Sequence, residues 1–127
     1  MSSAGAARVL GTVLAVGLSV VGGTGCADGV SCRSYAAPAL RVHILDATGT
    51  PVCDAKVVVH DGGFTETLRA IPRDASTPCV YFGPIERRGT YRIEATARGA
   101  TANATKVKVT ADPCHVITRE VTLTLTG

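Results

Sequence analysis

Apolar and polar residues alternate with a period of two along most of the chain beyond residue 38, and this pattern constrains the fold more than any other feature. Between residues 91 and 98 every second side chain is apolar, namely Tyr91, Ile93, Ala95 and Ala97. Successive side chains of a β-strand point to opposite faces of a sheet, so this run predicts a strand with one buried face. Helical spacing is not sustained in this region, and we expect an all-β domain.

Residues that favour turns divide this region into seven expected strands. They cover residues 40–44, 55–60, 64–70, 79–82, 91–98, 101–110 and 114–126, with loops at 46–51, 72–78 and 83–89. The apolar phase slips between Ala104 and Val107, which predicts a β-bulge. Seven short strands at spacings of about ten residues predict an antiparallel β-sandwich.

The last expected strand is less regular than the others. Its apolar face would carry Ile117, Val121, Leu123 and Leu125. Arg119 falls in the same phase, so we expect the first half of this strand to lie at the rim of the sandwich.

The N-terminal region has a different composition. Residues 9–25 contain no charged side chain, follow Arg8 and end at Cys26. The run is too short and too rich in glycine for a transmembrane helix, which needs about 20 strongly apolar residues. It has the order of a secretory signal peptide. We therefore expect a cleaved signal peptide at 1–25, a tether at 26–38 and one domain at 39–127.

The last residues of this run, Gly23-Thr24-Gly25-Cys26, resemble the lipobox of bacterial lipoproteins. The resemblance implies that Cys26 becomes the N-terminus and carries acyl chains such as palmitate. Gly23 departs from the pattern, because the family usually has an aliphatic residue there. The alternative is an ordinary signal peptide cleaved near a cysteine that forms a disulfide.

A second resemblance covers residues 39–126. The segments Asp46-Ala47-Thr48-Gly49-Thr50-Pro51-Val52, Asp54-Ala55-Lys56-Val57, Gly89-Thr90-Tyr91-Arg92-Ile93 and Arg98-Gly99 are similar in order to the carboxypeptidase regulatory-like domain. That family is a non-catalytic, transthyretin-like β-sandwich common in bacterial envelope proteins. Ala100 departs from it, since an aromatic residue often follows the glycine. We also expect Tyr91 to bury its ring and to tie its hydroxyl to the backbone.

Five cysteines are present, and setting Cys26 aside leaves Cys32, Cys53, Cys79 and Cys114. An even number in an exported chain is suited to two disulfides. Four cysteines allow three pairings. The alternating directions of the expected strands favour Cys53 with Cys79 and Cys32 with Cys114.

Charge and aromatic content argue against a nucleic-acid partner. The chain has 13 basic and 10 acidic residues, and its signal peptide contains only one of them, Arg8, so the expected mature net charge is +2. Aromatic residues make up 4% of the chain and Trp is absent, which gives little support to a stacking surface for bases.

No recognisable catalytic pattern is present, and we expect neither an enzyme nor a cofactor. His43, His60 and His115 lack the close His and Glu spacing of a catalytic zinc site, and we expect them at the surface. A metal site formed across strands by His43, His60 and Asp61 stays open as an alternative. The C-terminal residues 123–127 lack the Tyr-Arg-Gly-Ser of the transthyretin-like hydroxyisourate hydrolases.

Two loops are candidates for surface roles. A hairpin tip made by Asp61, Gly62, Gly63, Phe64 and Glu66 is a candidate partner-contact loop, although turn chemistry with one core Phe is the favoured explanation of this segment. We expect residues 86–88, Glu-Arg-Arg, to be a solvated loop.

These features predict a non-enzymatic cell-envelope lipoprotein that acts as a structural or protein-binding module. Its expected partners are a membrane, through the lipid anchor, and an envelope protein or glycan. Ala27 after Cys26 favours the outer membrane, because Asp at this position is associated with retention in the inner membrane. The alternative is a secreted, periplasmic or anchored β-sandwich that binds a small ligand or carbohydrate at loops 61–64 and 83–89.

Overall fold

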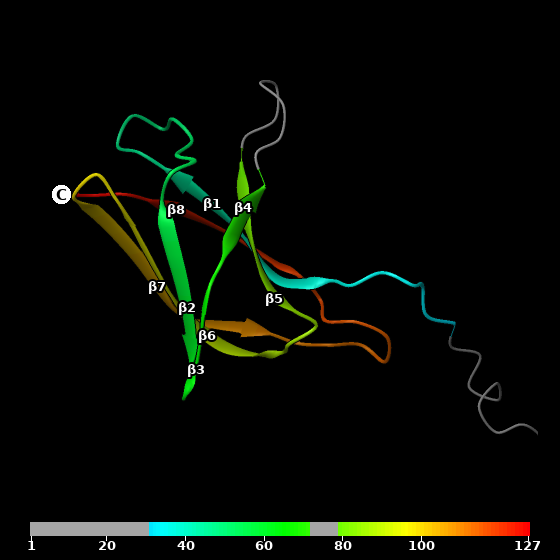
Figure 1. Ribbon diagram of the computed structural model, residues 1–127. Coiled ribbons are helices and arrows are strands. Elements are labelled where there is room, and N and C mark those ends of the chain that lie inside the picture. Colours follow the sequence, from blue (N-terminus) through cyan, green and yellow to red (C-terminus); the bar gives the residue numbers. More distant parts are fainter. Residues whose placement is uncertain (1–30, 72–78) are drawn as a thin grey trace, which may run out of the picture.

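The computed structural model describes residues 31–71 and 79–127, which form eight β-strands and no helix. Figure 1 shows these strands, with the segment before β1 and the loop before β8 on the same side of the molecule. The strands are β1 (Pro38–Leu45), β2 (Lys56–Asp61), β3 (Phe64–Thr67), β4 (Arg69–Ile71), β5 (Val80–Ile85), β6 (Gly89–Ala97), β7 (Ala100–Val109) and β8 (Arg119–Thr124).

The strands form two four-stranded sheets with the orders β4-β5-β1-β8 and β3-β2-β6-β7. The alternation of the sequence explains the core between them, because β1, β2, β6 and β7 turn apolar residues inward. Leu40 and Val42 of β1 are fully buried, as are Val57 of β2 and Tyr91 and Ile93 of β6. The all-β architecture is therefore as predicted.

The number of strands differs from the prediction. The expected strand at 64–70 is divided at Leu68, so that β3 lies in one sheet and β4 in the other. Leu68 is buried, and its N–H donates to the carbonyl of Val57 at 2.8 Å. The chain thus crosses between the sheets at this residue, which the apolar pattern did not reveal.

The sandwich is also not wholly antiparallel, because β1 and β8 pair in parallel from Leu40 opposite Arg119 to Leu45 opposite Thr124. The physical reason is the loop at 110–118. It leaves β7 and begins β8 at the end of the molecule where β1 begins, and both strands therefore run the same way.

Residues 114–118 form a loop rather than the first half of the last strand. Ile117 is 52% exposed, whereas Val116 is buried and forms an isolated bridge with Ala111. The expected inward position of Ile117 was wrong, since a loop does not keep the two-residue period. Leu123 and Leu125 are buried, and Arg119 is exposed as its rim position predicted.

The predicted β-bulge is present between β6 and β7. Tyr91 lies opposite Val107, while Ile93 lies opposite Ala104, so β7 has one extra residue. Lys106 within this interval has a φ of 56°. The bulge re-aligns the apolar faces on either side of the phase slip.

Disulfides join Cys32 to Cys114 and Cys53 to Cys79, which is the pairing expected from the strand directions. The bridges lie at opposite ends of the sandwich. We call residues 32–37, 85–90 and 108–119 the tether end, and residues 46–55, 97–101 and 125–127 the turn end.

Candidate functional site

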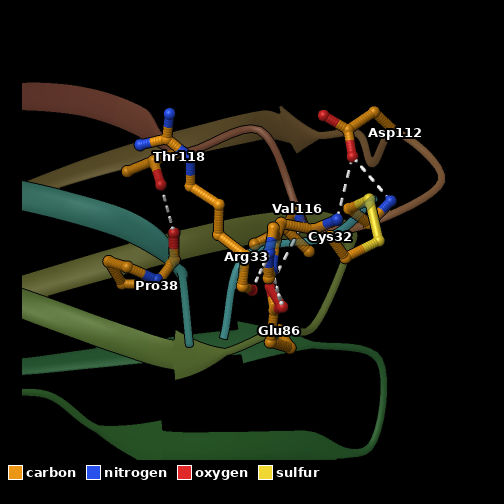
Figure 2. A network of polar contacts seen from close by, with 9 residues as sticks. Cys32, Arg33, Pro38, Glu86, Asp112, Val116 and Thr118 are labelled. Carbon is orange, nitrogen blue, oxygen red and sulfur yellow. Dashed lines mark hydrogen bonds and ion pairs between the residues drawn. A yellow bond between two sulfur atoms is a disulfide. The ribbon is translucent and has the colours of Figure 1, made fainter. Parts of the chain in front are cut away.

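At the tether end, the segment before β1 is fixed to the domain, although we expected residues 26–38 to be only a connection between the anchor and the domain (Figure 2). The Cys32–Cys114 disulfide makes the first attachment. The N–H of Glu86 donates to the carbonyl of Ala37 at 2.8 Å, and the hydroxyl of Thr118 donates to the carbonyl of Pro38 at 2.7 Å. The described chain is therefore held to the sandwich from Cys32 onward.

Glu86 and His115 lie at the centre of this network. One carboxylate oxygen of Glu86 accepts from the N–H of Val116 at 3.1 Å, and the other contacts Nδ1 of His115. Nε2 of His115 lies 3.0 Å from the carbonyl oxygen of Arg33, and Tyr35 stacks on the imidazole with ring centroids 4.3 Å apart. Because both ring nitrogens face acceptors, only the protonated imidazole donates to both.

The electrostatics of this pair agree with that protonation state. The hydrogen bond from His115 lowers the pKa of Glu86, and the same bond raises the pKa of His115. Asp112 accepts from the N–H groups of His115 and Cys114 at 2.8 Å each, and these bonds lower its pKa. The arrangement holds three distant segments together, and its polar groups are taken up by that role.

The hairpin tip predicted as a contact loop is partly engaged by Arg87. The guanidinium donates to Asp61 at 2.9 Å and lies over the ring of Phe64, with its Cζ 3.8 Å from the ring centroid. Gly62 and Gly63 are exposed, and Glu66 is half-buried. Contact of this tip with a partner stays a prediction.

Sequence reasoning missed the role of Arg87, since residues 86–88 were expected to be a solvated loop. Of these three residues, only Arg88 is exposed and forms no side-chain hydrogen bond or ion pair with another described residue. Tyr91 is fully buried and its hydroxyl donates to the carbonyl of Arg87, as we expected from the residue itself. A tyrosine whose hydroxyl bonds to the backbone a few residues upstream is called a tyrosine corner in β-sandwiches. Here the bond spans four residues, from Tyr91 back to Arg87.

The three histidines lie apart. His43 is on β1 in one sheet, His60 is on β2 in the other, and His115 is at the tether end. His60 contacts Glu94 at 3.1 Å and Thr65 at 3.2 Å. Within residues 31–71 and 79–127, no three His, Cys, Asp or Glu side chains form a group that could hold a metal ion.

Two adjoining hollows lie beside β5, and Phe82 and Ile85 line both. One has a volume of about 390 Å³ and also includes Glu66, Thr67, Arg69 and Gly83. The other, of about 210 Å³, also includes Ala36, Pro38, Arg41, Ile71 and Val80. Gly83 has a φ of 134°, a backbone conformation that residues with a Cβ atom rarely adopt.

Cys26 and the rest of the expected signal peptide lie outside the described residues. No helix long and apolar enough to span a membrane occurs in the described part of the chain. No protein-family model, curated protein or solved structure shows significant similarity to this chain.

Proposed function

We propose that this protein is a non-enzymatic, membrane-anchored lipoprotein of the cell envelope, whose β-sandwich is a structural or protein-binding module. The observation that carries the proposal is the use of cysteines. The two disulfides use four of the five, and Cys26 at the end of the uncharged run is the one left over. A cysteine at that place is suited to acylation.

The disulfides also support an exported location, because such bonds persist in oxidising compartments. Two acyl chains on Cys26 hold the protein firmly at a bilayer, since burial contributes about 0.8 kcal/mol per CH₂ and one chain alone binds marginally. Ala27 supports the outer membrane as the location.

The tether end supports a structural role. A pull on Cys26 is carried through Cys32 to Cys114 and, through the contacts of Ala37 and Pro38, to the region where β1 and β8 begin. The load therefore reaches β1 and β8, which are neighbours in one sheet and are the first and last strands of the chain. Assignment of the domain as carboxypeptidase regulatory-like rests on the sequence resemblance over residues 39–126.

Intact mass spectrometry of the protein from membranes of its native host tests the anchor. We expect the mass of a chain that begins at Cys26 plus its acyl groups. A Cys26→Ser variant should lose the lipid mass and leave the membrane fraction in a high-salt wash, which screens any electrostatic attachment. The proposal is wrong if that substitution changes neither the mass of attached lipid nor the membrane association.

The hollows beside β5 favour a second candidate function, the binding of a small ligand or carbohydrate. The larger one combines the aromatic ring of Phe82 with the polar groups of Glu66 and Arg69, a mixture suited to sugars. Binding of envelope glycan oligosaccharides on an array tests it. A Phe82→Ala variant should then lose the signal while an Ala47→Ser variant at the turn end keeps it, and equal signals would contradict this candidate.

A further inference from the structure

The tether end exposes apolar side chains. Tyr35, Ile85 and Ile117 are each more than half exposed, and they are three of the four large apolar residues exposed in the described chain. Isolated apolar residues on a surface need no explanation, but three exposed at one end of a small domain are typical of a surface that contacts a membrane or another protein. Tyrosine is also a residue favoured at membrane interfaces.

The same end carries basic side chains with no acidic partner. Arg33, Arg88, Lys108 and Arg119 are exposed and form no ion pair within the described residues. The two carboxylates of the tether end are both engaged, because Glu86 contacts His115 and Asp112 accepts from backbone amides. Asp112 keeps its negative charge, because backbone amides do not neutralise a carboxylate, but the four unpaired basic side chains outnumber it. The surface therefore has a net positive charge.

Three of these basic residues are close neighbours. Arg88 and Lys108 line one shallow hollow of about 560 Å³, together with residues at the start of β6 and at and just beyond the end of β7. The guanidinium of Arg119 donates to the carbonyl of Lys108 at 3.0 Å. A hollow between two basic side chains suits an anionic phosphate group.

We propose that the tether end is a membrane-contact surface that binds anionic phospholipid headgroups around the anchor, an inference that rests on the lipid anchor at Cys26. Cys32 is fixed to this end, and the residues from Cys26 to Cys32 reach at most about 20 Å when fully extended. The end that faces the bilayer is therefore the one with exposed apolar and basic groups. Such a combination binds anionic membrane surfaces.

Single-tryptophan variants of the lipidated full chain test which end touches the bilayer, because the native chain has no Trp. Ile117→Trp places the probe at the tether end, and Ala47→Trp places it at the turn end. In vesicles of phosphatidylglycerol and brominated phosphatidylcholine, we expect quenching of the first probe and not of the second. The inference would be overturned if both probes were quenched to the same extent. It would also be overturned if the quenching of Ile117→Trp were the same in vesicles without phosphatidylglycerol. Ile85→Trp serves if Ile117→Trp does not fold.

Charge reversal tests the basic side chains in the full chain with Cys26→Ser, which cannot be acylated. Arg88→Glu with Lys108→Glu should weaken binding to phosphatidylglycerol vesicles, measured by sedimentation, by about 25-fold or more, since each basic residue near an anionic surface contributes about fivefold. Lys56→Glu with Arg98→Glu is the matched control, with the same change of charge at exposed positions in and next to the turn end. Equal losses from the two pairs, or equal binding to phosphatidylcholine alone, would contradict the inference.

The two tests separate the anchor from the surface. A lipidated protein that sediments with vesicles while Ile117→Trp stays unquenched overturns the surface and leaves the anchor standing. Binding by the Cys26→Ser chain that depends on phosphatidylglycerol supports the surface, even if mass spectrometry finds no lipid on Cys26.

Discussion

The two ends of the sandwich each carry one disulfide but differ in how their polar contacts are made. At the turn end, Asp46 accepts from the N–H groups of Thr48 and Thr50 at 2.9 and 3.0 Å, all within one tight turn. At the tether end, His115 contacts Arg33, 82 residues away, and Glu86, 29 residues away. The hydrogen bonds of the Asp46 turn are therefore local, whereas the Glu86–His115 network forms only after three segments have met.

The ends also differ in what they show to solvent. Three of the four exposed large apolar side chains lie at the tether end, and the fourth, Ile71, pairs with Val80 next to Cys79. At the turn end, Arg98 forms an ion pair with Asp54 at 3.1 Å. At the tether end, four basic residues have no acidic partner in the described chain. This difference in exposed apolar and unpaired basic side chains is the observation on which the proposed membrane contact of the tether end rests.

Removal of the disulfides should give the largest effect. The loops they close span 82 and 26 residues, and loop entropy predicts losses of about 4.5 kcal/mol for Cys32→Ala with Cys114→Ala and about 3.5 kcal/mol for Cys53→Ala with Cys79→Ala. Urea unfolding of the two variants measures both. A larger loss from the second pair would show that packing around the buried Cys79 outweighs chain entropy.

Two tyrosine substitutions compare the ends with smaller effects. The hydroxyl of Tyr81 donates to the carbonyl of Val52 at 2.8 Å and accepts from the N–H of Ala55 at 2.9 Å, so Tyr81→Phe leaves two backbone groups without a partner. We expect it to cost about 2 kcal/mol, and Tyr91→Phe about 1 kcal/mol because it frees only one carbonyl. Thermal unfolding measures both, and the reverse order would show that Arg87 depends on Tyr91 more than the contacts indicate.

The pH dependence of stability should separate the ends further. The bond from His115 lowers the pKa of Glu86, so its contribution is complete above 4.5 and is lost as the pH falls through the lowered value. The bond from Glu86 raises the pKa of His115, so that contribution is complete below 6.5 and is lost as the pH rises through the raised value. The pair therefore stabilises fully between pH 4.5 and 6.5.

Urea unfolding across pH tests this, with Glu86→Gln expected to reduce both the acidic and the alkaline loss. At the turn end, the hydrogen bond from Thr48 lowers the pKa of Asp46, so Asp46→Asn should reduce only the loss below about pH 3.8. An unchanged alkaline slope in Glu86→Gln would mean that His115 does not hold its proton through Glu86.

The smallest effect is expected from Arg98→Ala. Its ion pair with Asp54 is exposed, with side chains 70% and 59% accessible, and such pairs contribute little in water. We expect no change in the thermal midpoint beyond experimental scatter. Arg87→Ala should lower the midpoint measurably, because this side chain joins Asp61, Phe64 and Tyr91. If the two variants shifted the thermal midpoint equally, the contacts of Arg87 would not contribute to stability.

Much of the fold was predictable because strand periodicity is local. The alternation at Tyr91 and Ile93 identified a buried face, and the slip between Ala104 and Val107 identified the bulge. The crossing at Leu68 was not predictable, since an apolar residue in either sheet preserves the same alternation. Ile117 was placed wrongly because periodicity continues in a sequence even where the backbone leaves the strand.

The candidate site was less accessible from sequence. The cysteine pairing could be inferred, since strand directions place Cys32 and Cys114 at the same end. The partnership of Glu86 with His115 and the role of Arg87 could not, because each depends on where loops from separate strands meet.

The sequence by itself determined that this chain forms a β-domain behind an uncharged N-terminal run and has four cysteines beyond Cys26, because periodicity, composition and cysteine count are properties of the order of residues. Only the tertiary structure decided that residues 32–37 are held to the domain and that apolar and basic groups gather beside them. Those features arise from contacts between residues as far apart as Cys32 and Cys114, and no local pattern records them.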